Sequence, residues 1–298
     1  MLPEAFLERM KRQLGDEYES YLDSLNRPRA VALRFNPLKG EIPQLPFVGQ
    51  PVPWEPMGYY YDPDARPGLH IFHEAGVYYL QEASAMAPVA LLDPQPGERV
   101  CDLCAAPGGK TAQLINGGAE VISLDISETR LKKLRDNMAR LQFSPPQTVC
   151  ADGADYLQNC KSGQFDAILL DAPCSATGTL RRHPELVHIK TVADVEKQTV
   201  LQKKLLDAVP PALKPGGFLV YCVCSIAKAE GEEQLKTFLE THAGFRLCPL
   251  AAEDICRCPG PDISEIFTPE GCIRTLPFHL ADCGGLDSFF IAKLQKVA

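Results

Sequence analysis

The sequence predicts an α/β fold built on a doubly wound, mostly parallel sheet. From Glu98 onward, apolar runs of strand length alternate with amphipathic stretches of helix length, which is the pattern of a parallel sheet covered by helices. Three of the runs, at residues 98–103, 165–170 and 218–223, end in turns that carry cysteine or aspartate. Because the carboxyl ends of parallel strands open at one edge of the sheet, where ligands bind, we expect these three ends to lie together.

A small α+β domain is expected first, over residues 1–72. Residues 3–25 carry apolar side chains at helical spacing, and residues 30–35 have the composition of a strand. The stretch 38–68 is rich in proline and contains glycine, so it predicts loops and short strands.

The second domain is expected over residues 73–298, beginning where the composition shifts near His73. An amphipathic helix is expected at residues 81–92. The strands expected after it are apolar runs closed by a turn, at residues 98–103, 121–124, 148–151, 166–170, 218–223, 272–276 and 288–294. The helices expected between them have apolar positions at helical spacing, at residues 109–115, 127–141, 193–213 and 230–241. Ser127 is suited to cap the second of these helices.

Composition and charge restrict the class of protein. The 298 residues are 45% hydrophobic and 23% charged, which is ordinary for a globular protein in water. No apolar run approaches the roughly 18 residues of a membrane span, and the N-terminus lacks an apolar signal core, so we expect a cytoplasmic protein with no membrane partner. The net charge of −8 disfavours nucleic-acid binding over the whole surface and leaves basic patches such as 130–135 and 181–183. A solvated helix face is the alternative for the first patch.

The twelve cysteines are scattered, which is typical of reduced thiols buried as small apolar side chains. Cys101 and Cys104 form a Cys-x-x-Cys pair, but no second pair follows at zinc spacing. A looser set near the C-terminus consists of Cys248, Cys256, Cys258, Cys272 and Cys283. We predict no metal site.

The turn after residues 98–103 is similar to two phosphate-binding motifs but matches neither. Cys104 stands where a Walker A loop needs its first glycine, and a dinucleotide fingerprint needs glycines that this turn lacks. Its small residues and backbone amides still let a cofactor approach the strand end closely. The turn consists of Cys104, Ala105, Ala106, Pro107, Gly108, Gly109 and Lys110.

Two aspartates follow the next two predicted strands. Asp125 ends one strand, where a carboxylate accepts ribose hydroxyls in nucleoside-binding sheets, and Asp152 follows the other, where it could accept from an adenine amino group. A helix cap or turn residue is the alternative for each. In series after a glycine-containing turn, they favour an adenosine cofactor without a bound phosphate chain, and S-adenosylmethionine fits best.

Several longer motifs make the sequence similar to one family. DLCAAPGGKT lies at 102–111, DAPCSATGTLRRHP at 171–184 and VYCVCS at 220–225. With these motifs the chain resembles the Sun-type RNA cytosine-5 methyltransferases. GVYYLQEASAMAPVALLDPQPGERV at 76–100 and GGLDSFFIAKL at 284–294 extend the likeness toward the bacterial RsmF/RsmB-like branch that acts on rRNA. The likeness covers about residue 29 to the C-terminus, and it implies a Rossmann-like sheet with an antiparallel strand at the C-terminus.

The resemblance also implies roles for individual residues. Cys224 matches the nucleophile that adds to carbon 6 of cytosine, Cys174 matches the cysteine that helps release the product, and Asp171 matches the aspartate that binds the target base near the cofactor. The turn 104–110 matches the segment that binds the methionine part of S-adenosylmethionine. The remaining cofactor positions are Asp125 on the ribose, Asp152 on the adenine, and Arg130.

The implied chemistry explains these residue types. Carbon 5 of cytosine is a poor nucleophile, and a thiolate that adds at carbon 6 makes the ring reactive enough to attack the methyl group. A base then removes the carbon 5 proton and the thiol leaves, all in a pocket that holds an unstacked base.

The implied partner is RNA, rRNA first and tRNA as the alternative, presented by an N-terminal segment with Arg27, Arg29 and Arg34. DNA is not expected, and the protein is expected to be a monomer. A different reading is an RNA-binding assembly factor that keeps the fold and methylates poorly.

One departure from the family pattern affects the nucleophile. The family usually has threonine just before that cysteine, and here the residue is Val223. Cys222 lies two residues before Cys224, so in a strand both side chains would point to the same face. We assign Cys224 because it sits at the strand end and Ser225 continues the motif.

Overall fold

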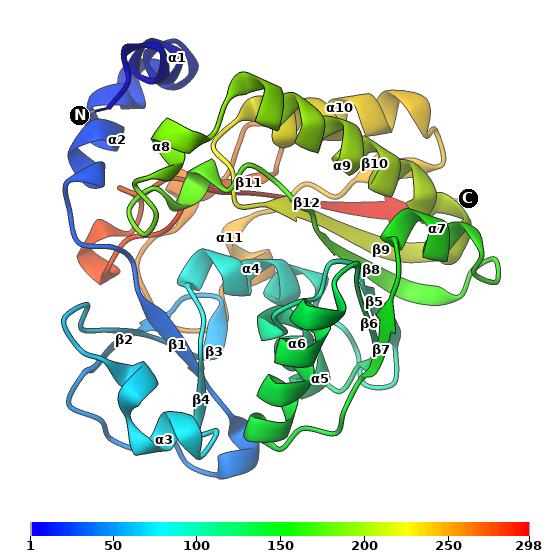
Figure 1. Ribbon diagram of the computed structural model, residues 1–298, viewed down its shortest axis with the longest axis horizontal. Coiled ribbons are helices and arrows are strands. Elements are labelled where there is room, and N and C mark those ends of the chain that lie inside the picture. Colours follow the sequence, from blue (N-terminus) through cyan, green and yellow to red (C-terminus); the bar gives the residue numbers. More distant parts are fainter. Residues whose placement is uncertain (1, 298) are drawn as a thin grey trace.

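The computed structural model describes residues 2–297, so Met1 and Ala298, the outer ends of the two expected domains, lie outside it. Two sheets organise the chain (Figure 1). The larger has eight strands in the order β10-β12-β9-β8-β5-β6-β7, with β11 also paired to β12, and the smaller has the order β2-β3-β1-β4. No helix in residues 2–297 is both long and apolar enough to cross a membrane.

The larger sheet confirms the predicted fold class. Its parallel strands are β5 (Arg99–Asp102), β6 (Glu120–Asp125), β7 (Gln147–Cys150), β8 (Phe165–Asp171) and β9 (Leu213–Val223). The antiparallel strand β12 (Phe289–Lys296) follows β9, and the short strands β10 (Phe245–Leu247) and β11 (Ile273–Thr275) pair with β12. Strands β5, β8 and β9 are neighbours, so their carboxyl ends share one edge as the sequence predicts.

Helices cover both faces of the larger sheet, which makes it doubly wound (Figure 1). One face packs against α4 (Ala83–Leu92), α5 (Gly109–Asn116), α6 (Glu128–Leu141) and the short α11 (Ala252–Ile255). The other packs against α7 (Gly153–Gln158), α9 (Val192–Ala212) and α10 (Glu232–Thr241). The strand residues alternate between the two apolar clusters, since Val220 and Cys222 belong to the first and Leu219 and Tyr221 to the second.

The structure differs from the sequence prediction in a few elements. Strand β9 begins at Leu213, not near residue 218, and its register against β8 shifts between Phe165 and Ala167 to absorb the Pro-Gly-Gly segment. Helix α7 and strand β10 are missing from the prediction because six and three residues are too short to show a period.

The smaller sheet is antiparallel and comes from the N-terminal part of the chain. Its strands are β1 (Ala32–Phe35), β2 (Val48–Val52), β3 (Glu55–Tyr61) and β4 (Tyr78–Leu80), and the short helix α3 (Ile71–Glu74) precedes β4. Strand β4 pairs with β1 although it lies after residue 72. The division between residues 72 and 73 stays a prediction, and this pairing favours a boundary after β4.

The first two helices, α1 (Glu4–Leu14) and α2 (Tyr18–Leu25), do not cover the smaller sheet. Their buried residues Phe6, Met10 and Tyr21 form one apolar cluster with Leu180 and Ile226, which lie in the loops after β8 and β9. Figure 1 shows α2 beside α8 (Leu186–Ile189), and Leu186 and Val187 of α8 pack against the same cluster. The N-terminus is therefore held against the loops that follow β8 and β9.

Polar side chains link the smaller sheet to the larger. Arg34 is 2% exposed and donates to Gln81 Oε1 at 3.2 Å and to Gly109 O at 3.1 Å. Gln113 of α5 donates to Glu55 of β3 at 2.5 Å. The expectation that Arg34 presents RNA is therefore wrong, because its guanidinium is buried and engaged with the turn that begins α5. Arg27 and Arg29 are exposed.

The link through Asn36 predicts a measurable loss of stability. Asn36 is buried, and its amide donates to Gly76 O at 3.0 Å and to Leu141 O at 2.7 Å. Asn36→Ala leaves these two carbonyls without their donor, so we expect the free energy of unfolding to fall by about 2 kcal/mol in urea titrations. Asn26→Ala, at an exposed position, is the control and should change it by less than about 0.5 kcal/mol. Equal losses in the two variants would contradict this role.

Candidate active site

Two thiols meet at the shared edge of the larger sheet. Cys174 follows β8 and Cys224 follows β9, and their sulfur atoms lie 3.4 Å apart. Both side chains are partly exposed. The neighbouring positions of β8 and β9 produce this contact between residues 50 positions apart in the chain.

Asp171 and Lys110 form an ion pair beside the thiols. Asp171 ends β8 and Lys110 lies in the first turn of α5, with Nζ 2.7 Å from Asp171 Oδ2. Burial by itself lowers the pKa of Lys110, but the charge of Asp171 outweighs it and the net pKa is raised. Lys110 therefore stays charged and holds the carboxylate of Asp171 in place.

The structure distinguishes Cys222 from Cys224, which the alternation of side chains along a strand leaves equivalent. Cys222 is fully buried, its thiol donates to Asp171 Oδ1 at 3.4 Å, and burial raises its pKa well above the usual value. Cys224 is partly exposed. A ligand at this edge can reach Cys224, whereas Cys222 lies behind Asp171 as a neutral thiol.

Cys174 is also held as a thiol. Its hydrogen bond with Cys224 and its burial both raise its pKa well above the usual value. Either sulfur can donate in the contact of 3.4 Å between Cys174 and Cys224.

The turn 104–110 is closed by backbone hydrogen bonds and by α6. Ala105 N donates to Leu124 O at 2.7 Å, and Gly108 N donates to Ala105 O at 2.8 Å. Gly108 has φ 104°, and a Cβ there would lie 2.9 Å from Leu134 Cγ. Only glycine suits this position, where the chain passes tightly over α6 before α5 begins.

Asp125 and Arg130 lie next to this turn. Asp125 ends β6, is 2% exposed, and accepts from Ala106 N at 3.4 Å and from Ser127 N at 3.0 Å. Arg130 Nη1 lies 3.2 Å from the Asp125 carboxylate, and its other nitrogen donates to Ala106 O at 2.5 Å. The carboxylate thus acts as a turn residue and also lies beside the turn 104–110.

Asp152 has the structure of a helix cap. Its Oδ1 accepts from Ala154 N at 2.9 Å and Asp155 N at 3.2 Å, and Lys204 Nζ lies 3.0 Å from its Oδ2. This is the alternative that the sequence left open. The assignment of Asp152 to adenine stays a prediction.

Sequence reasoning missed several residues at this edge. Ile126, directly after Asp125, is 71% exposed although it is a large apolar residue. Glu230 is fully buried and accepts from Ser175 and Ser225, the residues that follow the two cysteines. The serine after each cysteine was the available signal, but nothing in the local sequence indicates that both bind one glutamate.

Asp102 lies buried behind the turn. Its Oδ2 accepts from Thr111 Oγ1 at 2.6 Å, and Oδ1 has no hydrogen-bond partner within residues 2–297. Burial raises the pKa of Asp102 to about 7. Asp102 is therefore protonated in the folded chain at acidic pH.

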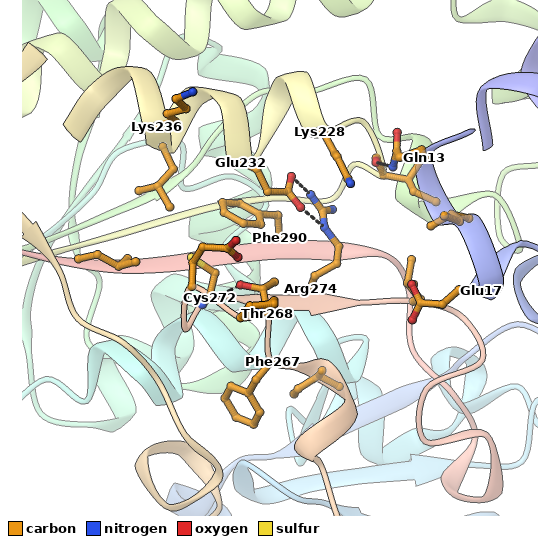
Figure 2. A pocket seen from close by; sticks show the side chains of 18 of the residues that line it. Gln13, Glu17, Lys228, Glu232, Lys236, Phe267, Thr268, Cys272, Arg274 and Phe290 are labelled. Carbon is orange, nitrogen blue, oxygen red and sulfur yellow. Dashed lines mark hydrogen bonds and ion pairs between the residues drawn. The ribbon is translucent and has the colours of Figure 1, made fainter. Parts of the chain in front are cut away.

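A cavity of about 850 Å³ lies away from these groups (Figure 2). Side chains of α10, β11 and β12 line it together with the end of α1, and Arg274 points toward Glu232 inside it. None of the predicted site residues lines this cavity. Shape alone would therefore miss the edge where the thiols and the carboxylate converge.

The cysteines outside the thiol pair do not form a recognisable ligand set. Cys101 is buried in its strand and Cys104 opens the turn. Within the described part of the chain, no three His, Cys, Asp or Glu side chains are grouped as metal ligands would be.

The raised pKa of Asp102 predicts how stability depends on pH. Below the unfolded pKa of about 4 the group is protonated in both states. Between about pH 4 and 7 the unfolded chain releases this proton first, so the wild type loses up to about 1.4 kcal/mol per pH unit through Asp102.

In Asp102→Asn this loss is absent, so the variant should gain about 2 kcal/mol relative to wild type between pH 5 and pH 7 in urea titrations. Asp23→Asn, at an exposed position, is the matched control and should show no such trend. A difference for Asp102→Asn that stays flat with pH would refute the assignment.

Comparison with known proteins supports one family. The family described as 16S rRNA methyltransferase RsmB/F matches residues 89–295, and the N-terminal domain of 16S rRNA methyltransferase RsmF matches residues 2–83. The ribosomal RNA small subunit methyltransferase B of Serratia proteamaculans (strain 568) is 39% identical over 256 residues, which is 82% of this chain and 59% of that protein. That of Pectobacterium atrosepticum is 42% identical over 235 residues, 78% of this chain and 49% of that protein. The chain thus spans about half to three fifths of the length of these relatives.

Solved structures agree with the fold. A methyltransferase homolog protein from Pyrococcus horikoshii is 30% identical, with a TM-score of 0.79 over 99% of this chain and 95% of its own. NSun6 from the same organism has the same TM-score at 22% identity and bears on the fold alone. The resemblance drawn from the sequence motifs is confirmed by these comparisons.

Proposed function

This chain belongs to the 16S rRNA methyltransferase RsmB/F family, and we propose that it transfers a methyl group from S-adenosylmethionine to carbon 5 of a cytosine in RNA. rRNA is the leading substrate because the relatives are named for it. The observation that carries the proposal is the contact of 3.4 Å between Cys174 and Cys224, beside the ion pair of Asp171 and Lys110.

The cofactor side of the edge suits S-adenosylmethionine, the methyl donor of this family. The turn 104–110 offers backbone groups and the charged Lys110, and Asp125 beside it would accept from ribose hydroxyls. Ile126 is an exposed apolar side chain next to Asp125 and offers a surface for the adenine ring. Bound there, the cofactor would supply an electrophilic methyl group to carbon 5 of a cytosine held at the ends of β8 and β9, and its sulfur would keep the electron pair of the bond that breaks.

Cys224 is the nucleophile in this proposal. Its thiolate forms a bond to carbon 6 of cytosine, and the electron pair of the ring double bond becomes available at carbon 5 for bonding to the methyl group. Asp171 accepts from the exocyclic amine or a protonated ring nitrogen, and Lys110 holds that carboxylate in place. A base then takes the carbon 5 proton, the electron pair of that C–H bond restores the ring double bond, and the sulfur of Cys224 leaves carbon 6 with the electron pair of the carbon–sulfur bond.

Cys174 acts at the release step. Its thiol lies against the sulfur atom that must leave the ring, and it is held uncharged in the free protein. From this position the thiol of Cys174 can exchange a proton with the departing sulfur of Cys224 or with a group near carbon 5, and the backbone need not move.

The first test separates the two neighbouring cysteines. Cys224→Ala should lower transfer of labelled methyl groups to rRNA by at least about 1,000-fold, because no thiolate then reaches the ring. Cys222→Ser keeps a donor toward Asp171 and should stay within about tenfold of wild type. Full activity of Cys224→Ala, or no 5-methylcytosine from the wild type with either rRNA or tRNA, would refute the proposal.

The second test concerns release. With Cys174→Ala the adduct should form and persist, so we expect a covalent protein–RNA band in denaturing gels with RNA and S-adenosylmethionine. The double variant Cys174→Ala/Cys224→Ala is the control and should give no band. Normal turnover of Cys174→Ala without any adduct would show that the release role is wrong.

Two alternatives remain distinguishable by mapping. Bisulfite sequencing of rRNA and tRNA from cells with and without the protein identifies the substrate class. A lost site in tRNA would assign the same chemistry to tRNA. Cofactor binding without a lost site in either RNA would favour a weakly catalytic assembly factor.

A further inference from the structure

A buried carboxylate connects the two thiol-bearing loops from behind. Glu230 ends the short turn Lys228–Glu230 after β9, and its side chain is fully buried. Its Oε1 accepts from Ser175 N at 2.7 Å and from Gln202 Nε2 at 3.3 Å, and its Oε2 accepts from the hydroxyls of Ser175 and Ser225. These donors are all neutral, so the carboxylate is held by hydrogen bonds and not by an ion pair within the described residues.

The donors come from both sides of the thiol pair. Ser175 directly follows Cys174, and Ser225 directly follows Cys224. Their hydroxyl oxygens lie 3.1 Å apart, and Thr177 Oγ1 lies 3.0 Å from the first and 3.1 Å from the second. Both loops are therefore tied to one point.

Two further hydrogen bonds hold the backbone on either side of this network. Gln202 also donates to Pro173 O at 2.8 Å, so the residue before Cys174 is held as well as the residue after it. The hydroxyl of Tyr221 donates to Glu230 O, which fixes the backbone of Glu230 to β9. A buried carboxylate is costly unless it is fully hydrogen-bonded, so the network has little freedom to move.

We propose that Glu230 is a positioning residue that sets the spacing between the thiols of Cys174 and Cys224, so that the thiol of Cys174 can reach the adduct formed on Cys224. The proposal rests on the proposed function for its consequence in the reaction, but not for the spacing itself. Glu230→Gln removes one acceptor, because its amide nitrogen then faces either the amide donors of Ser175 and Gln202 or the hydroxyls of Ser175 and Ser225, and those groups can no longer donate to that position.

The spacing is tested without RNA. In wild type, oxidised dithiothreitol should convert the two thiols to a disulfide, and the reagent takes up the two electrons and two protons that they lose. The yield at equilibrium, quantified by peptide mass spectrometry, gives the effective concentration of one thiol at the other. We expect Glu230→Gln to lower it at least tenfold, while Glu233→Gln, which removes a charge at an exposed position of α10, leaves it unchanged. An unchanged value in Glu230→Gln would overturn the proposal.

The amount of covalent protein–RNA adduct is a second measurement, and general destabilisation of the fold would not raise it. Glu230→Gln should accumulate covalent protein–RNA adduct, as Cys174→Ala does, with the KM for S-adenosylmethionine unchanged. Equal slowing of adduct formation and release would contradict a role in positioning Cys174. Cofactor binding by calorimetry confirms that the variant is folded. If it is not, Ser175→Ala and Ser225→Ala each remove one donor, and both should lower the effective concentration.

The two proposals fail in different ways. If the wild type methylates neither rRNA nor tRNA but the effective concentration still depends on Glu230, the proposed function is refuted and the role of Glu230 in spacing the thiols is supported. If the wild type methylates RNA but Glu230→Gln leaves the effective concentration unchanged, only the positioning role of Glu230 is refuted.

Discussion

The parallel register between β8 and β9 is the constraint on which the site depends. It makes Asp171 and Cys222 direct partners across the two strands. The chains then leave the sheet side by side, so Cys174 and Cys224 meet a few residues later. A shift of one residue would turn the Cys222 and Cys224 side chains to the opposite face and separate the thiols from the carboxylate. The other contacts of the site can form only when β8 and β9 pair in this register.

The carboxylates at this edge differ because their partners differ. Asp171 is paired with Lys110, Asp125 with Arg130, and Glu230 with neutral donors, whereas Asp102 is so buried that its pKa rises to about 7. An ion pair leaves a charged group that can orient a base. Neutral donors around a buried carboxylate instead fix the surrounding backbone. The same functional group thus serves for recognition at one position and for rigidity at another.

The smaller sheet belongs to the cofactor side of the site as much as to the N-terminus. Arg34 of β1 binds the backbone at the start of α5, and Glu55 of β3 binds Gln113 in the same helix. These contacts hold α5, which carries Lys110, against the smaller sheet from one side while the larger sheet holds it from the other. Arg34, which the sequence suggests for RNA binding, is engaged inside the protein instead. A buried guanidinium needs hydrogen-bond acceptors, and only tertiary contacts provide them.

The sequence by itself determined the alternating strands and helices and the shared edge of β5, β8 and β9, since hydrophobic period is a local property. Its motifs also marked Cys224, Cys174, Asp171 and Lys110 as candidates, through their likeness to one family. Tertiary structure decided what depends on distant segments. It buried Cys222 and left Cys224 accessible, made Asp152 a helix cap, and brought Ser175 and Ser225 to Glu230. Burial and hydrogen-bond partners are set by which elements pack together, and that choice is made by the whole chain.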